Sequence, residues 1–341
     1  MTESRSLVVM FLLVCSCSLG AGASLAKLPD AAISTWTRGN ELPNNLSVSV
    51  VSKTTVVIKG NSSNSLSADK YLICAPNYLV AFLDEAGDGK ALSLASEIMS
   101  RTEYYSFRIE RQSVPDKSQY LLSEFGATPD HTYKKIRSNV KSHILGKLNI
   151  YVVTGGIALS DLATSPKYQI LGTDTIQRDG NSFLRVNFRC PEQPKDDMYI
   201  VSGYCDLDEH SSWTCPHAKF TRNEGPKSVE YTLNTSYVTV AGCKLIQRRE
   251  VYGVDKGDVR NTISWVTDYE YSTDKIDEAQ FFLSYYGLPE PEGVSIPRKA
   301  TSIYLWLLLA AAILAVLAAA FRTIQRRWTR VTNPIAPPPT R

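Results

Sequence analysis

The part of the sequence richest in reactive side chains is Cys205 to His217, which holds two cysteines and two histidines of the kind that bind zinc. Cys205, His210 and Cys215 are evenly spaced. A zinc site of this spacing needs a further cysteine at position 202, which is Ser202, and one residue between Cys215 and His217 is poor geometry for a substitute ligand. The sequence therefore predicts no metal and no cofactor. We expect an exposed loop anchored by a disulfide bond.

Five cysteines remain once the N-terminal segment is set aside, and in an oxidising compartment they should pair. An odd number leaves one over, and Cys74 is the candidate because it lies more than a hundred residues before the others. The four disulfide candidates are Cys190, Cys205, Cys215 and Cys243.

The Cys190 and Cys243 pair, with Trp213 between them, invites comparison with an immunoglobulin domain. Trp213 comes too late for the core tryptophan of that fold. The tyrosine corner is also absent, because Ala241 stands two residues before Cys243. A β-sandwich of another kind stays open for this half of the chain.

Motifs of catalysis are missing from the sequence. Neither G-x-S-x-G nor H-E-x-x-H occurs, and residues 86–90 lack the first glycine and the Ser/Thr of a phosphate loop. His131 and His143 fall on or beside the polar face of an expected helix, where we expect them to be solvated. Adjacent acids such as Asp208 and Glu209 would point to opposite faces of a strand, so they do not form a catalytic acid/base pair. We expect them to mark turns. The sequence predicts that the protein is not an enzyme.

A membrane span is predicted at Ile303–Phe321, 19 residues without charge, proline or glycine. Residues 1–26 have the charged start, apolar centre and small residues of a secretory signal. Four arginines follow the span within nine residues, and Arg298 and Lys299 precede it, which favours a cytoplasmic C-terminus. Three sequons, at Asn45, Asn61 and Asn234, would then be glycosylation sites.

Net charge excludes nucleic acid as a partner. The whole chain has a net charge of +3, but without the signal and tail the folded part has 31 basic and 33 acidic residues. Such a balance gives no electrostatic case for binding a polyanion.

The elements expected to position these residues are mainly strands. Amphipathic helices are predicted at residues 91–105 and 128–146, and a polar loop at Gly60–Ser67. Residues 46–59 read as two short strands or a hairpin. Further strands are expected at residues 71–74, 78–83, 148–153, 183–189, 198–202, 229–233, 237–240, 262–271 and 280–286.

The predicted fold is an α+β ectodomain, mainly β, with two amphipathic helices, a C-terminal half compatible with a β-sandwich, and one transmembrane helix. Its segments are a signal peptide (1–26), a mixed helix and strand half (27–179), a disulfide-bearing β half (180–286), a stalk (287–302), the span (303–321) and a cytoplasmic tail (322–341).

This plan resembles type I surface glycoproteins, among them the single-pass immune-evasion and entry glycoproteins of large DNA viruses such as cytomegaloviruses. The expected function is binding of another protein in surface recognition, adhesion, entry or immune modulation. Its partner would be a protein ligand or a membrane partner chain. The expected location is the secretory pathway, at the plasma membrane, an endomembrane or a viral envelope. A membrane-tethered secretory enzyme and an accessory subunit of a membrane complex stay open as alternatives.

Overall fold

A computed structural model describes residues 28–39, 41–83, 92, 95–114, 117–127, 140, 143–153, 157–191, 198–292, 294 and 303–332. The chain divides into two compact units, Met1–Glu290 and Pro291–Arg341. The predicted signal peptide, His131 and most of the second predicted helix lie outside the described residues.

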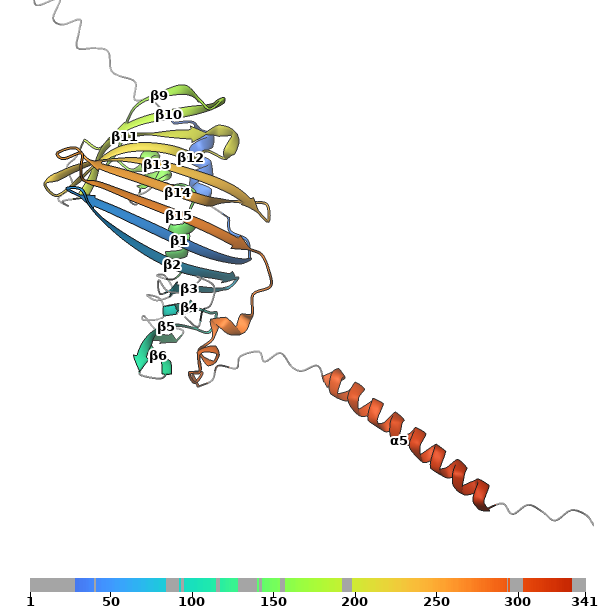
Figure 1. The fold of residues 1–341 in the computed structure, drawn as a ribbon. Helices are drawn as coiled ribbons and strands as arrows, with labels where there is room; N and C mark the ends of the chain where they lie inside the picture. Colours follow the sequence, from blue (N-terminus) through green and yellow to red (C-terminus); the bar gives the residue numbers. More distant parts are fainter. Residues whose placement is uncertain are drawn as a thin grey trace, which may run out of the picture. The chain divides into compact units, whose positions relative to one another are not determined.

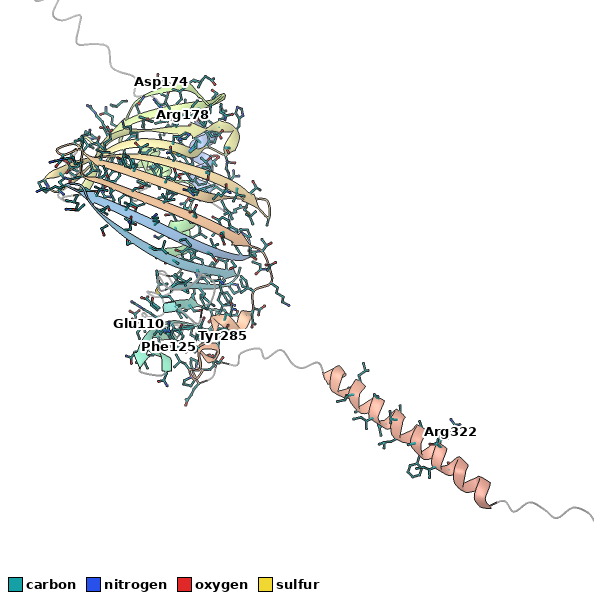
Figure 2. The ribbon with its side chains drawn as sticks, viewed as in Figure 1. Glu110, Phe125, Asp174, Arg178, Tyr285 and Arg322 are labelled. Atoms are coloured by element: carbon teal, nitrogen blue, oxygen red, sulfur yellow. The ribbon has the colours of Figure 1, made fainter. Side chains whose placement is uncertain are left out.

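One antiparallel sheet of thirteen strands forms the first unit (Figure 1). The first strand along the chain lies at the centre of the sheet, beside the last one. In spatial order the strands are β6 (Lys117–Ala127), β5 (Tyr105–Val114), β4 (Ala95–Arg101), β3 (Asn77–Leu83), β2 (Asn61–Cys74), β1 (Asn45–Ile58), β15 (Thr262–Ser272), β14 (Cys243–Asp255), β13 (Lys227–Val240), β12 (Thr214–Glu224), β11 (Met198–Asp208), β10 (Asn181–Arg189) and β9 (Gln169–Arg178). Asp174 and Arg178 mark one edge, on β9, and Phe125 marks the other, on β6 (Figure 2).

Alternating burial explains the central strands. In β1, Leu46, Val48 and Val50 are buried, and the residues between them are only partly covered. β1 is a single strand of 14 residues rather than two short ones. The loop predicted at Gly60–Ser67 is also wrong, because Lys59 and Gly60 make the turn with positive φ and Asn61 already pairs with Ile58. The polar stretch is the exposed first half of β2.

Helical segments cover one face of the sheet, which we call the inner face. They are α2 (Asp30–Arg38), residues 143–148 and α4 (Leu159–Thr164). The main hydrophobic core lies between them and the sheet. A small two-stranded sheet, β7 (Val152–Val153) with β8 (Ile157–Ala158), precedes α4.

Only one of the two predicted helices is present in the described residues. Residues 143–148 confirm the C-terminal end of the second, with Val140 and Ile144 fully buried, and they continue past Gly146. The first is wrong, because residues 95–101 form β4, where Ile98 and Ser100 alternate with less buried neighbours, and Tyr105 begins β5.

A smaller core lies on the opposite, outer face. Tyr71 and Ile73 of β2 belong to the main core, so Leu72 between them points outward. Two 3-10 turns, Glu278–Phe281 and Leu283–Tyr286, stand where the last strand was predicted. Ser100 Oγ donates a hydrogen bond to the Phe281 carbonyl at 2.9 Å, which fastens these turns to β4.

The predicted class, mainly β with few helices, is confirmed, but the two halves do not separate. Strands from before and after residue 180 share the same sheet, so the C-terminal half forms no sandwich of its own. The second unit contains α5 (Ile303–Thr332), of which Leu307–Gln325 is long and apolar enough to cross a membrane. Arg322 lies on the same helix (Figure 2).

Candidate functional site

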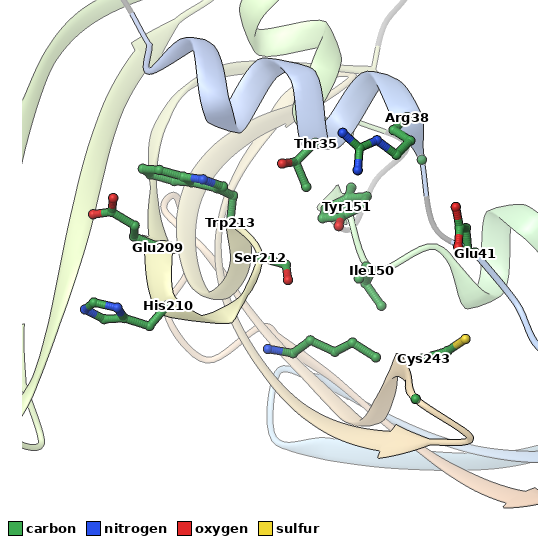
Figure 3. A pocket seen from close by; sticks show the side chains of 13 residues that line it. Thr35, Arg38, Glu41, Ile150, Tyr151, Glu209, His210, Ser212, Trp213 and Cys243 are labelled. Atoms are coloured by element: carbon green, nitrogen blue, oxygen red, sulfur yellow. The ribbon is translucent and has the colours of Figure 1, made fainter.

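A pocket of about 540 Å³ opens beside the C-terminal end of α2 (Figure 3). Four segments far apart in sequence enclose it: the last turn of α2, residues 150–151, the turn from β11 to β12, and the turn from β13 to β14. Ile150, Tyr151 and Trp213 are its buried apolar lining. The volume falls within the usual range for small-molecule sites, about 300–1,000 Å³.

Trp36 fixes α2 to the wall of this pocket. Its Nε1 donates a hydrogen bond to the Trp213 carbonyl at 3.0 Å, and both side chains are buried. The wall itself is a tight turn, because Ser212 and Trp213 both have a φ of 57°. The Trp213 amide donates to the Asp208 carbonyl at 2.9 Å, which closes the turn.

Charged side chains of both signs converge on the pocket. The basic ones are Arg38, His210 and Lys244, and the acidic ones are Glu41 and Glu209. Arg38 is exposed and forms no hydrogen bond or ion pair with the described residues, but its charge opposes the rise in pKa that burial causes at Tyr151.

Lys244 is held against the floor of the pocket. Its Nζ donates to the Ser211 carbonyl at 3.2 Å and lies 5.0 Å from the centre of the Tyr237 ring. Burial lowers the pKa of Lys244, and the nearby Asp208 carboxylate opposes that shift. Lys244 is therefore already engaged, whereas Arg38 is available to a ligand.

A second cavity of about 230 Å³ shares Arg38 and Gly39 with the first. Its other lining residues are Leu42, Leu145, Leu148 and Asn149. Leu145 is 36% exposed although it is a large apolar side chain. A polar pocket and a mainly apolar cavity thus meet at the last turn of α2.

The sequence prediction for residues 205–217 is wrong in its structure. β11 and β12 run through most of this stretch, and only residues 209–213 form the connecting turn. Cys205 and Cys215 are buried rather than exposed, and the proximity of Cys215, followed by burial, raises the pKa of the Cys205 thiol. Among the described residues the structure contains no disulfide bond.

The remaining cysteines are spread over the sheet. Cys243 lines the pocket, Cys74 ends β2, and Cys190 lies half-buried beside Tyr168 at the end of β10. Register places Cys190 next to Val201 and Cys243 opposite Val240. These positions are on the order of 30 Å apart along the strands at about 3.3 Å per residue, so Cys190 and Cys243 cannot pair.

The histidines lie in separate settings. His210 lines the pocket, and His217 Nδ1 shares a hydrogen bond of 2.9 Å with Asn234 Oδ1 on β13. His143 is not on a solvated face as predicted: it packs edge-on against Tyr71 and Phe82. Burial, followed by the charge of Lys147, lowers its pKa, and Asp69 opposes them. In the described residues no group of three or more His, Cys, Asp or Glu side chains could hold a metal ion.

The three sequon asparagines all lie in strands. Asn61 is exposed at the start of β2, and Asn234 is exposed within β13. Asn45 Nδ2, the atom a glycan would occupy, donates to the carbonyls of Thr273 and Asp274 at 3.2 and 3.1 Å. Glycosylation at these sites stays a prediction.

Sequence reasoning missed the pocket. Its one local signal was α2, which has Asp30 in the first turn, Arg38 in the last turn and Gly39 with a φ of 80° just after it. No sequence pattern connects these residues with the turns at 209–213 and 242–244.

Comparison with known proteins finds no matching family model and no matching curated protein. Solved structures do match over three quarters of the chain. They include the LolA superfamily protein NE2245 from Nitrosomonas europaea (13% identity, 76% of this chain and 100% of that one, TM-score 0.35). A DUF1329 family protein from Desulfovibrio piger has 8% identity, the same coverages and a TM-score of 0.36. A domain described as belonging to outer membrane lipoprotein sorting, from Vibrio parahaemolyticus, has 11% identity, covers 75% and 97%, and has a TM-score of 0.35. A likeness at this level assigns no ligand to this chain.

The predicted function is wrong. Recognition, adhesion, entry or immune modulation through a protein-binding ectodomain was expected, with a tethered enzyme or an accessory subunit as alternatives. The structures that match are instead a LolA superfamily protein, a DUF1329 protein and a lipoprotein-sorting domain. The resemblance to viral glycoproteins stays a prediction.

Proposed function

We propose that the first unit binds a small amphipathic molecule at the last turn of α2. The observation that carries this proposal is the meeting of two unlike cavities at Arg38 and Gly39. The larger one offers charged and hydrogen-bonding side chains, which suit a polar head. The smaller one offers Leu42, Leu145 and Leu148, which suit an apolar chain.

Arg38 selects the charge of the head. It lines both cavities, its guanidinium forms no hydrogen bond or ion pair with the described residues, and its five N–H donors suit a carboxylate or a phosphate. An acyl chain in the second cavity would cover Leu145, which water now reaches. The ligand is therefore an anionic amphiphile of the fatty-acid or lysophospholipid class, and the role of the pocket is binding rather than catalysis.

The membrane supplies ligands of this class. α5 is a candidate membrane span covalently joined to the binding unit. The signal-like N-terminus and the arginines after the span favour an exported first unit with its N-terminus outside the cytosol. A tethered lipid-binding unit on that side of a membrane is the function that these features support.

Equilibrium dialysis of a radiolabelled medium-chain fatty acid against the full chain in lipid nanodiscs tests the proposal, with empty nanodiscs as the blank. We expect saturable binding at one site. Arg38→Leu should weaken it roughly tenfold or more, because a hydrogen bond to a charged group contributes about 1.5–3 kcal/mol. Arg189→Leu is the matched control, since Arg189 is exposed and bonds Gln169 at the edge of the sheet.

The chain-binding cavity has its own variant. Leu145→Asp should weaken binding of long-chain acids and leave short-chain acids nearly unchanged, because the charge is placed where only a long chain reaches. Binding no greater than the blank would overturn the proposal. Equal affinities for Arg38→Leu and Arg189→Leu would overturn the assignment of the head to Arg38.

A further inference from the structure

Cys205 and Cys215 are side by side in the β11–β12 hairpin. Both belong to the main hydrophobic core, and they are 1% and 4% exposed. A register shift between Asp206 and Asp208 brings Cys215 toward Cys205 on the inner face of the sheet. Cys215 Sγ donates a hydrogen bond to the His217 carbonyl at 3.1 Å, and the proximity of Cys215 raises the pKa of the Cys205 thiol. The two cysteines therefore lie in the same buried layer of one hairpin.

We propose that Cys205 and Cys215 form a disulfide bond in the protein outside the cytosol, made by exchange with the disulfide of an oxidised carrier protein. This rests on the exported location inferred above, but not on the ligand. The bond closes a short loop that contains the turn at residues 209–213 and so fixes the Trp213 wall of the pocket.

The exchange balances within the two proteins. One cysteine thiolate attacks a sulfur of the carrier disulfide and expels the other carrier sulfur as a thiolate. The second cysteine thiolate then attacks the mixed disulfide, forms the Cys205–Cys215 bond and releases the carrier as a dithiol. Two electrons pass to the carrier, and the two protons lost by the cysteines are regained by its thiolates.

The burial of the two cysteines determines when disulfide exchange can occur during folding. The proximity of Cys215, followed by burial, raises the pKa of the Cys205 thiol, so the folded pair contains little thiolate. Neither sulfur is open to a carrier once α2 covers the hairpin through Trp36 and Trp213. Exchange therefore precedes the packing of α2, and the finished bond is protected from reductants.

Mass spectrometry reads the pair directly, because no lysine or arginine lies between the two cysteines and both fall in the tryptic peptide 196–219. The full chain is taken from membranes without reductant, denatured with a thiol-alkylating reagent and digested. We expect the peptide without alkyl groups and lighter than the dithiol form by two hydrogen atoms. Recovery with two alkyl groups, or linked to Cys190, would overturn the proposal.

A refolding experiment distinguishes an error in the inferred location from an error in the inferred cysteine pairing. If the peptide from cells is alkylated yet the bond forms when the denatured chain refolds in a glutathione redox buffer, the location is wrong and the pairing is right. If neither sample contains the bond, the pairing is wrong. Ligand binding, measured by dialysis, is scored independently of both results.

Stability provides a second readout. Closing a loop of this length should raise the Tm by about 5–10 °C relative to the reduced protein. A Cys205→Ala/Cys215→Ala double variant should lose this dependence on reductant. Cys74→Ser should keep it, because Cys74 ends β2, on the other side of the central strands β1 and β15. The bond is reduced in the denatured chain, and the Tm is measured after refolding. A wild-type Tm that is the same with and without this reduction would count against the bond.

Discussion

Replacing Trp36 by Phe should loosen α2 from the pocket wall. Trp36 is 5% exposed, and its Nε1 donates to the Trp213 carbonyl, 177 residues further along the chain. Phe keeps an aromatic ring in the core but has no donor. The buried Trp213 carbonyl therefore loses its partner, and the smaller ring leaves space beneath the helix.

The magnitude follows from these two losses. An unsatisfied buried carbonyl costs about 1–3 kcal/mol, and the missing part of the indole ring costs roughly 1 kcal/mol more. Together they lower the free energy of unfolding by about 3 kcal/mol, which lowers the Tm by roughly 6–12 °C in a unit of this size. Because α2 also carries Arg38, binding of the fatty acid should weaken along with stability.

Urea unfolding of the full chain, followed by far-UV circular dichroism, measures the change. Thr37→Ala is the matched control: Thr37 is exposed on the same helix and bonds only the Ile33 carbonyl one turn earlier. Its effect should stay within about 0.5 kcal/mol. If Trp36→Phe is no more destabilising than Thr37→Ala, the Trp36 hydrogen bond does not hold the helix and the reasoning fails.

Three further changes test the sheet and the helical segment that packs against it. Asp206→Asn should lower the free energy of unfolding by about 3 kcal/mol in urea titrations. The variant loses a fully buried carboxylate that accepts hydrogen bonds from Arg185 at 2.7 and 3.0 Å. A loss under about 1 kcal/mol would contradict this. Gly203→Ala should destabilise by about 1–3 kcal/mol, since its Cβ would lie 2.4 Å from the Lys219 carbonyl oxygen; an unchanged urea midpoint would show that β11 shifts freely. His143, whose pKa is lowered by burial, binds its proton more readily in the unfolded chain, so stability should fall as pH drops below about 6.5. His143→Leu should remove that part of the fall in Tm measured between neutral and acidic buffers, and an identical pH profile would refute the assignment.

Features that depend on a local property of the sequence could be predicted. The apolar run within α5 needs only length and composition, and it was found. β15 was placed within a residue of its bounds because Ile263, Trp265 and Tyr269 alternate with polar neighbours. β3 was found as an apolar run, predicted at residues 78–83, and β10 was predicted at residues 183–189.

Features that depend on distant partners could not be predicted. The first half of β2 is polar on both faces, and only its pairing with β1 reveals it as a strand. Ala95 and Ile98 fit a helical spacing, and only the pairing of β4 with β3 and β5 reveals them as part of a strand. The pocket is of the same kind, because its walls meet only after the sheet has formed.

The pairing of β1 with β15 has a consequence for how this chain is synthesised. Ser47 lies opposite Ser272, so the middle of the sheet joins the first strand made to the last. Until residue 272 has left the ribosome, two half-sheets each present an open edge of unpaired backbone groups, the kind of edge that invites aggregation. A chain shortened before Thr262 would keep both edges open for good. We therefore expect truncation near the C-terminal end of the sheet to yield insoluble protein, even though twelve of its thirteen strands remain.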